Sequence, residues 1–366
     1  MTQPHKTSVL SPLSLVNSLQ GFFSPRPTVV DESASQHLLS IPESPEPPSE
    51  SSEDQEEEED MQDTPVKLRA LRFSSKQKKW VPTSTSTGGQ KVDNPSILLP
   101  TSMRVITWNI DYQAPNQEER LQAALRHIAY EVLGCKVLEQ PPPCCILLQE
   151  VYARAFHVIP EFLWFREYFT MTCEPRHWPR GSTYGTVTLV ARSVPVAAAY
   201  TIEFSNSQFA RNALFVDLKL RIPDRQPPEN VTIRVANTHL ESLPVGTSKR
   251  PEQLAIIATF LKQDDVNGGV VCGDMNAIAP IDAEIPNVVG LSDAWRSGDV
   301  EEGLTWGFQS VGEAQRFPAN RLDKVLYVED TGYEIEEPET IGVGLKIPKG
   351  QWVSDHYGLF TQLHVV

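Results

Sequence analysis

Four apolar runs of strand length in the sequence each end in polar side chains suited to hydrolytic chemistry. These side chains are Asn109, Glu150, the pair His239 and Glu241, and the pair Asp274 and Asn276. Strands that lie side by side in a buried sheet bring the residues at their ends together at one edge. We therefore expect the four polar ends to line one cleft.

The oxygen-rich character of this set favours a hard divalent cation. Carboxylates and amides without thiolates suit Mg²⁺, with Mn²⁺ as a substitute. Glu150 is the best candidate ligand, because the apolar strand before it would hold it rigidly. Asp274 can orient or deprotonate a water, and the amide of Asn276 can donate to a phosphate oxygen or hold the attacking water in line.

A histidine near the C-terminus adds a group suited to phosphoester chemistry. His356, in the block Ser354-Asp355-His356, would stabilise the charge of a pentacoordinate phosphorus when it is protonated. A carboxylate on its far ring nitrogen would fix its charge and tautomer, and Asp323 is the candidate. A single histidine or strand-end carboxylate is usually structural, so the prediction depends on the ordered set.

The elements that position these residues follow from the apolar periodicity. Apolar residues at helical spacing between Leu121 and Val132 predict one helix, and a second is expected over 253–262. Strands are expected over 103–108, 144–148, 186–192, 213–220, 231–236, 270–272, 322–328 and 358–365. Strands intermixed with helices favour one α/β domain, with sheets covered on both sides.

The net charge divides the chain into three segments. The 366 residues carry a formal charge of −15, which excludes a uniformly basic nucleic-acid coat. Residues 1–66 hold two basic and 13 acidic side chains among many Ser and Pro, and predict a disordered acidic tail. Residues 67–100 hold seven basic side chains and one acidic side chain, and predict a basic linker arm able to touch a polyanion. The catalytic domain is expected over residues 101–366.

Cysteine use and hydropathy predict the state of the thiols and the absence of a membrane span. The five cysteines are an odd number without CxxC spacing and lie mostly in apolar runs. We therefore expect reduced core thiols of an intracellular protein, not a disulfide framework or a zinc site. The sequence contains no run of about 18 apolar residues, so we expect no membrane span. The N-terminus has no secretory signal pattern.

Six blocks resemble, in order, the motifs of the endonuclease/exonuclease/phosphatase superfamily. They are Thr107-Trp108-Asn109-Ile110-Asp111, Leu148-Gln149-Glu150-Val151, Thr238-His239-Leu240-Glu241-Ser242, Gly273-Asp274-Met275-Asn276, Arg321-Leu322-Asp323 and Ser354-Asp355-His356. The resemblance covers residues 101–366 and implies a four-layer α/β sandwich, in which two packed mixed β-sheets are flanked by helices. It also implies Mg²⁺-dependent hydrolysis of phosphoesters.

Within the superfamily, further details are most similar to the 5′-tyrosyl-DNA phosphodiesterases. They are Arg211-Asn212, Thr305-Trp306, and Arg250 with Gln253-Leu254 after the Thr-His-Leu-Glu-Ser block. This resemblance implies hydrolysis of the bond between a topoisomerase tyrosine and a DNA 5′-phosphate, in DNA repair. We accordingly expect a monomer in the nucleus, or in the cytoplasm, that takes DNA 5′ ends with a tyrosyl adduct.

The resemblance implies three groups of site residues. The catalytic group, which supports the phosphate, activates water and stabilises the transition state, is Asn109, Asp274, Asn276, His356 and Asp323. The metal group is Glu150 with Asp355. The group in contact with substrate is His239, Ser242, Trp306, Tyr184, Arg211 and Arg250.

One position departs from the family pattern. Ile278 stands where family members often carry an arginine, so a phosphate contact is missing or comes from another cation such as Arg296. Other reactions of the superfamily stay open, namely abasic-site cleavage, poly(A) shortening, and inositol-phosphate or sphingomyelin hydrolysis. A catalytically silent scaffold that binds DNA ends is the alternative from a different class of protein.

Two short patches in the tail suggest protein partners. Residues 38–41, Leu-Leu-Ser-Ile followed by acidic residues, resemble a SUMO-interacting strand. Residues 16–23 resemble a degenerate sliding-clamp-binding box, in which Val16 stands where Gln is expected. Short apolar patches are common in such tails, so both are hypotheses for a pull-down with residues 1–66.

Overall fold

The computed structural model describes residues 63–83, 98–299, 301–308 and 318–366. All of them belong to one compact unit, Glu53–Val366, whereas a second unit, Met1–Ser52, lies outside the described residues. The predicted SUMO-interacting and clamp-binding patches therefore also lie outside them.

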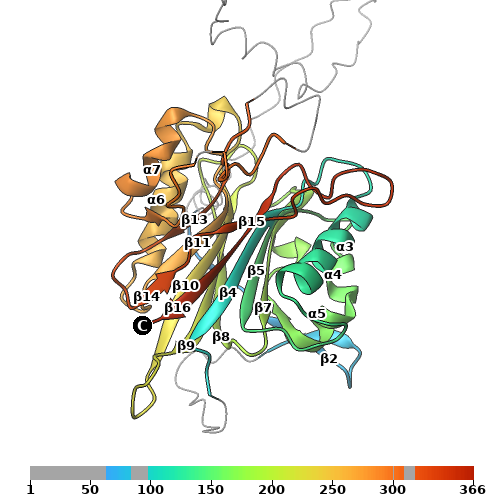
Figure 1. Ribbon diagram of the computed structural model, residues 1–366, viewed down its shortest axis with the longest axis vertical. Coiled ribbons are helices and arrows are strands. Elements are labelled where there is room, and N and C mark those ends of the chain that lie inside the picture. The colour runs from blue at the N-terminus through green and yellow to red at the C-terminus, as the bar shows by residue number, and fades with distance from the viewer. Residues whose placement is uncertain (1–62, 84–97, 300, 309–317) are drawn as a thin grey trace, which may run out of the picture. The chain divides into compact units, whose positions relative to one another are not determined.

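Two β-sheets pack face to face at the centre of the described unit (Figure 1). The seven-stranded sheet has the order β1 (Val66–Lys67), β8 (Val196–Glu203), β9 (Asn212–Arg221), β10 (Asn230–His239), β11 (Gly269–Asp274), β13 (Asp323–Tyr327), β12 (Ser292–Asp293). The nine-stranded sheet has the order β14 (Tyr333–Ile335), β16 (Gly358–Val365), β4 (Ser102–Asn109), β5 (Cys144–Tyr152), β7 (Tyr184–Ala191), β6 (Phe169–Met171), β2 (Leu71–Ser74), β3 (Lys79–Pro82), with β15 (Glu339–Ile341) on β16. Both sheets are mixed, because β4 and β5 are parallel in one, as are β10 and β11 in the other, among antiparallel neighbours.

Helices cover the outer face of each sheet (Figure 1). On the nine-stranded sheet lie α3 (Gln117–His127), continued by a π-helical turn (Ile128–Val132), then α4 (Val158–Glu161) and α5 (Leu163–Tyr168). On the seven-stranded sheet lie α6 (Arg250–Leu261) and α7 (Ile285–Val288), and single 3₁₀ turns span Pro175–His177, Pro244–Gly246 and Pro280–Ala283. The predicted four-layer α/β sandwich is confirmed.

The apolar runs of the central strands follow from this burial on both faces. On β9, Leu214 and Val216 belong to the core between the sheets, whereas Phe215 belongs to the core under α6. Since successive residues of a strand point to opposite faces, a strand between two cores carries consecutive apolar residues where both faces are buried. Each fully buried side chain of this size contributes about 1.5–3 kcal/mol, so both cores favour the same register.

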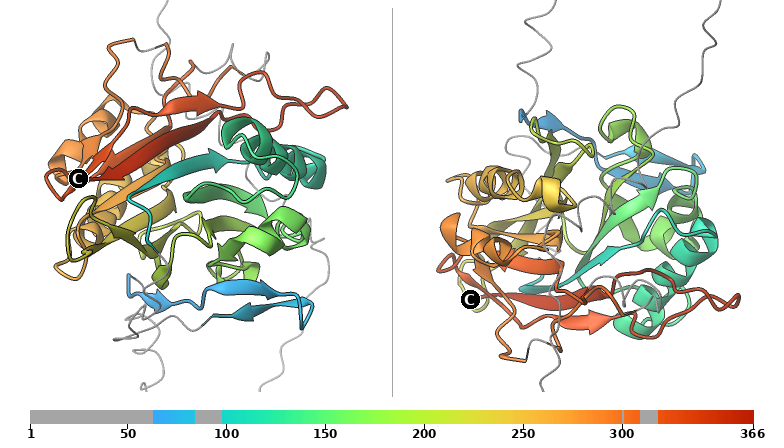
Figure 2. Two further views of the ribbon diagram at one scale, coloured as in Figure 1. Left: turned by 60° about the horizontal axis from the view of Figure 1, so that its bottom comes forward. Right: turned by 90° about the horizontal axis from the view of Figure 1, so that it is seen from above.

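The predicted linker arm is partly wrong, because residues 66–82 form three strands of the two sheets. β1 pairs with β8 of one sheet, and β2 pairs with β6 of the other, as Figure 2 shows for the blue strands beside the green ones. Leu68, Ala70 and Leu71 alternate with the basic residues of this segment and are buried. Residues 84–97 of the predicted arm lie outside the described residues.

The cysteines behave as the composition predicts. All five are buried and free, and Cys144, Cys145 and Cys272 belong to the same apolar core cluster. The described helices include none that is both long and apolar enough to span a bilayer.

Candidate active site

The two sheets present their polar strand ends at the same edge of the sandwich. β10 and β11 end in register with His239 opposite Asp274, and β13 begins with Asp323 opposite Asp274. From the other sheet, β4 ends at Asn109, whose side-chain amide donates to Asp274 Oδ2 at 3.0 Å. The expected gathering of these strand ends at one place is therefore present.

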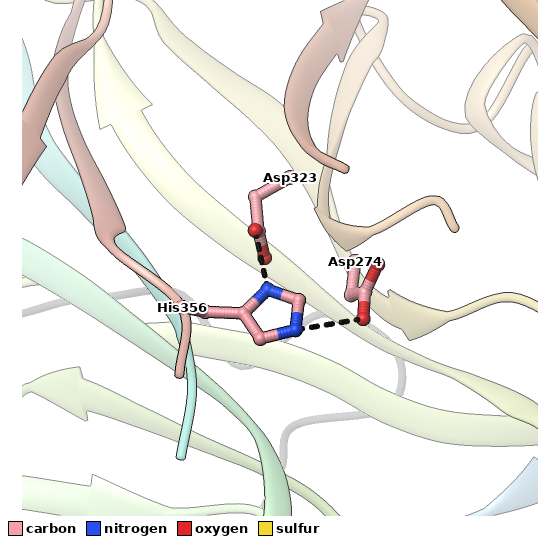
Figure 3. A group of neighbouring side chains, drawn as sticks. All are labelled: Asp274, Asp323 and His356. Atoms are coloured by element: carbon pink, nitrogen blue, oxygen red, sulfur yellow. Dashed lines mark hydrogen bonds and ion pairs between the residues drawn. The ribbon is translucent and has the colours of Figure 1, made fainter. Parts of the chain in front are cut away.

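His356 lies between two carboxylates (Figure 3). Its Nδ1 is 2.7 Å from Asp323 Oδ2, and its Nε2 is 3.8 Å from Asp274 Oδ2. Burial lowers the pKa of the imidazole, but the charges of Asp323, Asp274 and Asp355 outweigh burial and hold this pKa well above its usual value. His356 is therefore an imidazolium whose Nδ1–H donates to Asp323 and whose Nε2–H faces Asp274.

His239 has the opposite charge state. Arg211 Nη1 donates to His239 Nδ1 at 2.8 Å, which places the proton of the ring on Nε2. That nitrogen lies 3.3 Å from Asp274 Oδ2 and 3.8 Å from Glu150 Oε1. Burial, followed by the charges of Arg211 and His356, holds the pKa of His239 well below its usual value. His239 is therefore a neutral donor toward the carboxylates.

Arg211 also connects the remaining side chains on this side of the site. Its Nη1 donates to the Tyr184 hydroxyl and its Nη2 to Ser242 Oγ, each at 3.1 Å. The Tyr184 ring stacks on Tyr112, with 3.9 Å between ring centroids and 16° between planes. Four of the predicted substrate contacts therefore form one cluster around a single guanidinium.

Glu150 reaches the site through an irregularity in β5. The predicted end of this strand at Leu148 is wrong: β5 continues past Glu150, and its pairing with β7 shifts register between Leu148 and Val151. A bulge of this kind turns a side chain out of the ladder, and Glu150 has a left-handed φ of 54°. Its Oε2 accepts the backbone N–H of Tyr112 at 3.1 Å.

Comparison with known families decides the class of this site. The sequence profile of the Endonuclease/Exonuclease/phosphatase family matches residues 106–356, a span that holds every strand end described above. The chain belongs to this family. The resemblance of the six sequence blocks is therefore confirmed, and the molecule has the fold of a metal-dependent phosphoesterase.

Solved structures agree at the level of the fold. TDP2 from C. elegans is 20% identical with a TM-score of 0.57, and the match covers 73% of this chain and 76% of that one. D. rerio TDP2 complexed with single-strand DNA product is 18% identical with a TM-score of 0.55, covering 72% and 100%. The human Nocturnin catalytic domain with bound sulfate is 18% identical with a TM-score of 0.51, covering 74% and 97%. Curated protein sequences gave no match.

The family generally uses a divalent metal, and one group of described side chains that fits an ion is Asp274, Asp323 and His356. Their ligand atoms lie within 4.8 Å of one another. Nδ1 of His356 is engaged by Asp323, however, and an imidazolium has no lone pair to give a metal. This group therefore suits proton and charge handling better than metal binding.

A second set of oxygen donors, around Glu150, is linked by charge, although among the described residues it is not a group whose ligand atoms all lie within 4.8 Å of one another. Burial above all, and then the charges of Asp355 and Asp111, raise the pKa of Glu150 to about 7. Burial and the Asp355 charge also raise the pKa of Asp111. Three hard oxygen donors that repel one another are a donor set that a divalent cation would stabilise. Asp111, whose carboxylate pairs with Arg120, is a further oxygen donor that acts on the pKa of Glu150 and that the sequence prediction did not assign to the metal.

Two predicted site residues have partners other than those expected. Trp306, predicted as a substrate contact, donates its indole N–H to Asp355 Oδ2 at 3.0 Å. The side-chain amide of Asn276 donates to the Leu240 carbonyl at 2.9 Å, while its backbone N–H donates to Asp274 Oδ1 at 2.8 Å. Both residues thereby orient carboxylates of the site.

Glu241 of the Thr-His-Leu-Glu-Ser block and Arg250, which follows the block, both point away from the site. Arg250 is fully buried, with Nη2 2.7 Å from Asp282 Oδ2 and Nη1 donating to the Glu241 carbonyl. The predicted substrate contact by Arg250 is therefore corrected to a structural role, since none of its surface is exposed. The predicted place of Glu241 in the cleft is wrong, because its buried carboxylate accepts from the loop at residues 207–209 and from Gln253.

The cation expected to replace the family's arginine is also elsewhere. Arg296 donates its guanidinium to the Ile335 carbonyl at 2.7 Å, and its backbone N–H donates to Glu337. Ile278 is 39% exposed. Among the described contacts, the cation that touches the strand-end histidine is Arg211.

Sequence reasoning missed Arg120, which fixes the rim beside Glu150. Its guanidinium donates to backbone carbonyls of the 110–114 loop and of Trp352, and pairs with Asp111 at 2.9 Å. The signal was present, because Arg120 lies four residues before Ala124, a core position of the same helix. A buried arginine on an apolar helix face must have acceptors, and these acceptors lie beside the site.

Proposed function

We propose that the chain is a Mg²⁺-dependent phosphodiesterase that hydrolyses the 5′-phosphotyrosyl bond between a topoisomerase tyrosine and DNA. The observation that carries the proposal is the opposite charge of two facing groups: the His356 imidazolium lies 3.8 Å from the Asp274 carboxylate. Arg211 adds a fixed cation on the neighbouring histidine. A base, a charged donor and a cation in one site suit in-line attack of water on a phosphodiester.

Asp274 takes the proton of the attacking water in this mechanism. Its carboxylate is held by the Asn109 amide on Oδ2 and by the Asn276 backbone N–H on Oδ1. Burial raises the pKa of Asp274, which makes it a stronger base than a solvated aspartate. A proton moved to Asp274 lies close to the imidazolium of His356, whose Nε2–H donates to a phosphate oxygen as charge develops there.

The proposed metal residues would supply the remaining part of the mechanism. Bound by Glu150, Asp355 and Asp111, a divalent cation would polarise a non-bridging oxygen. The backbone N–H of Tyr112 orients Glu150, and the indole of Trp306 orients Asp355. Each carboxylate is thus held by a donor that cannot itself ligate a cation.

The substrate class is supported by the fold and by the cation cluster. The chain shares its fold with D. rerio TDP2, which was solved with a single-strand DNA product, so a DNA 5′ end is the proposed ligand. Arg211 and Ser242 offer donors for the phosphate of that end. The tyrosine leaving group has a solution pKa near 10, so strong acid catalysis is dispensable. We propose the nucleus as the site of action, because topoisomerase adducts on DNA would be repaired there.

A substrate panel tests this proposal with the full chain. With Mg²⁺ present, we expect turnover of a 5′-phosphotyrosyl oligonucleotide to exceed that of a 3′-phosphotyrosyl oligonucleotide, an abasic duplex and poly(A). Equal or greater activity on one of these three would overturn the substrate class and leave the family chemistry intact. Turnover that survives a metal chelator would instead contradict the metal dependence.

The alternative of a silent DNA-end-binding scaffold makes a different prediction in the same assay. A scaffold would bind the oligonucleotides without metal-dependent turnover of any of them. Both clusters of titratable side chains, one around His356 and one around Glu150, hold residues able to transfer protons or to bind a cation. This favours the enzyme over the scaffold.

The Asp323→Asn variant is expected to move the alkaline limb of the pH–rate profile to lower pH. Asp323 is the largest of the influences that raise the pKa of His356, and the protonated ring is the active form. Without that charge the ring loses its proton at a lower pH, so activity falls earlier as pH rises. The profile of kcat/KM from about pH 6 to 10 measures the shift. An unmoved alkaline limb would show that His356 does not act as an imidazolium.

A further inference from the structure

Glu241 is a buried carboxylate that the proposed mechanism does not use. It follows the end of β10 by two residues, and its side chain has no exposed surface. Its Oε1 accepts the backbone N–H groups of Gln208 and Phe209 at 2.8 and 3.2 Å. Its Oε2 accepts the Ser207 hydroxyl at 2.8 Å and the Gln253 amide at 3.1 Å. Four donors converge on one acceptor-only group.

Three of these donors belong to the loop that carries Arg211. The loop comprises residues 204–211 and joins β8 to β9. Ser207 Oγ, which donates to Glu241, also accepts the backbone N–H of Arg211 at 2.8 Å, and the Arg211 carbonyl accepts the N–H of Phe204. The backbone of Arg211 is therefore fixed to Glu241 through one side chain.

The Arg211 side chain extends from this loop into the site. Its guanidinium donates to His239, Ser242 and Tyr184. The bond to His239 decides which ring nitrogen carries the proton that faces Asp274. A displacement of the loop would move the Arg211 guanidinium. The protonated nitrogen of His239 would then no longer be fixed toward Asp274.

We propose that Glu241 is a positioning residue, which holds the 204–211 loop so that Arg211 reaches both His239 and the substrate phosphate. The phosphate contact rests on the proposed function, whereas the hold on the loop does not. Hydrogen bonds to an ionised group are stronger than neutral ones, which suits a carboxylate in this role better than an amide. In Glu241→Gln, one oxygen becomes an NH₂ that faces donors, so at least one of these bonds is lost.

A double-mutant cycle with Arg211→Ala separates positioning from general damage to the fold. We expect Glu241→Gln to lower kcat/KM on the order of 10-fold in the full chain. In the Arg211→Ala background the same substitution should change kcat/KM by less than about 2-fold, since the cation it positions is absent. Losses that multiply in the double variant would overturn the proposal. Asp217→Asn, which removes a different buried carboxylate, on β9, should leave kcat/KM unchanged with or without Arg211.

Two further measurements keep the inference separate from the proposed function. Hydrogen exchange at the amides of Gln208 and Phe209 should accelerate in Glu241→Gln, and unchanged exchange would contradict the hold on the loop. If no substrate of the panel is turned over, the proposed function fails. The double-mutant cycle then uses the Kd for a 5′-phosphorylated oligonucleotide, measured in the presence of a chelator, in place of kcat/KM. Ser207→Ala replaces Glu241→Gln if that variant does not fold. Its loss should likewise vanish without Arg211, and a loss that persists would overturn the proposal.

Discussion

Asp274→Asn is expected to lower the turnover rate by about 10²–10⁴-fold, the range for groups that accept or donate a proton in the transition state. The substitution removes the base, and it also places an NH₂ group where three donors converge. The Asn109 amide and His239 Nε2 both face Oδ2, and the Asn276 N–H donates to Oδ1. The side-chain amide cannot accept from all of them, so the orientation of the site is lost together with the base.

A matched variant separates the lost base from lost stability. Asp217 is also a buried strand carboxylate, and it pairs with Arg234. It lies on β9 four residues from Ala213, which is at the end of the strand nearest the site, so Asp217 is distant from the site. Asp217→Asn should lower thermal stability with little effect on turnover per folded molecule. Near-full activity of Asp274→Asn, measured with Mg²⁺ on a 5′-phosphotyrosyl oligonucleotide, would remove Asp274 from the mechanism.

The strands and the strand-end residues could be predicted from the sequence because burial on both faces leaves a simple pattern. The run before Asp274 has no polar residue, and in the run before Asn109 the apolar residues are interrupted only by Arg104 and Thr107, so the ends of both strands are visible in the sequence. The register that brings Asp274 opposite His239 and Asp323 follows once these strands are neighbours. This part of the site depends on local sequence and sheet geometry alone.

The parts that could not be predicted depend on contacts between distant segments. The bulge that presents Glu150 arises from the pairing of β5 with β7, more than thirty residues away along the chain. Glu241 follows a strand end as Asp274 does, yet it turns toward a loop whose donors lie 32–34 residues before it in sequence. Strands β1 and β2 have only two and four residues, and they exist as strands because they pair with β8 and β6. Periodicity carries no information about such partners.

Arg250→Met is expected to cost about 3–5 kcal/mol in the free energy of unfolding, the range for breaking a buried ion pair by removing one partner. Arg250 and Asp282 are both buried and joined at 2.7 Å, and the guanidinium also satisfies the carbonyls of Glu241 and Leu243. The methionine leaves the Asp282 charge without its cation and two carbonyls without a donor. Denaturant unfolding of the full chain, read as the change in free energy, measures the effect.

The second partner and an exposed pair supply the controls for this prediction. In Arg250→Met/Asp282→Leu no buried charge remains unpaired, so the double variant should recover part of the lost stability although it changes one more residue. Lys349→Met breaks the pair with Glu119, in which both side chains are about half exposed, and should cost at most about 1 kcal/mol. If the free energies of unfolding lost in Arg250→Met and in Asp282→Leu simply add in the double variant, the two residues act independently. The ion pair would then not be the origin of the lost stability. The stability of this pair matters for the site, because the carbonyl that Arg250 holds belongs to Glu241, whose carboxylate fixes the loop of Arg211.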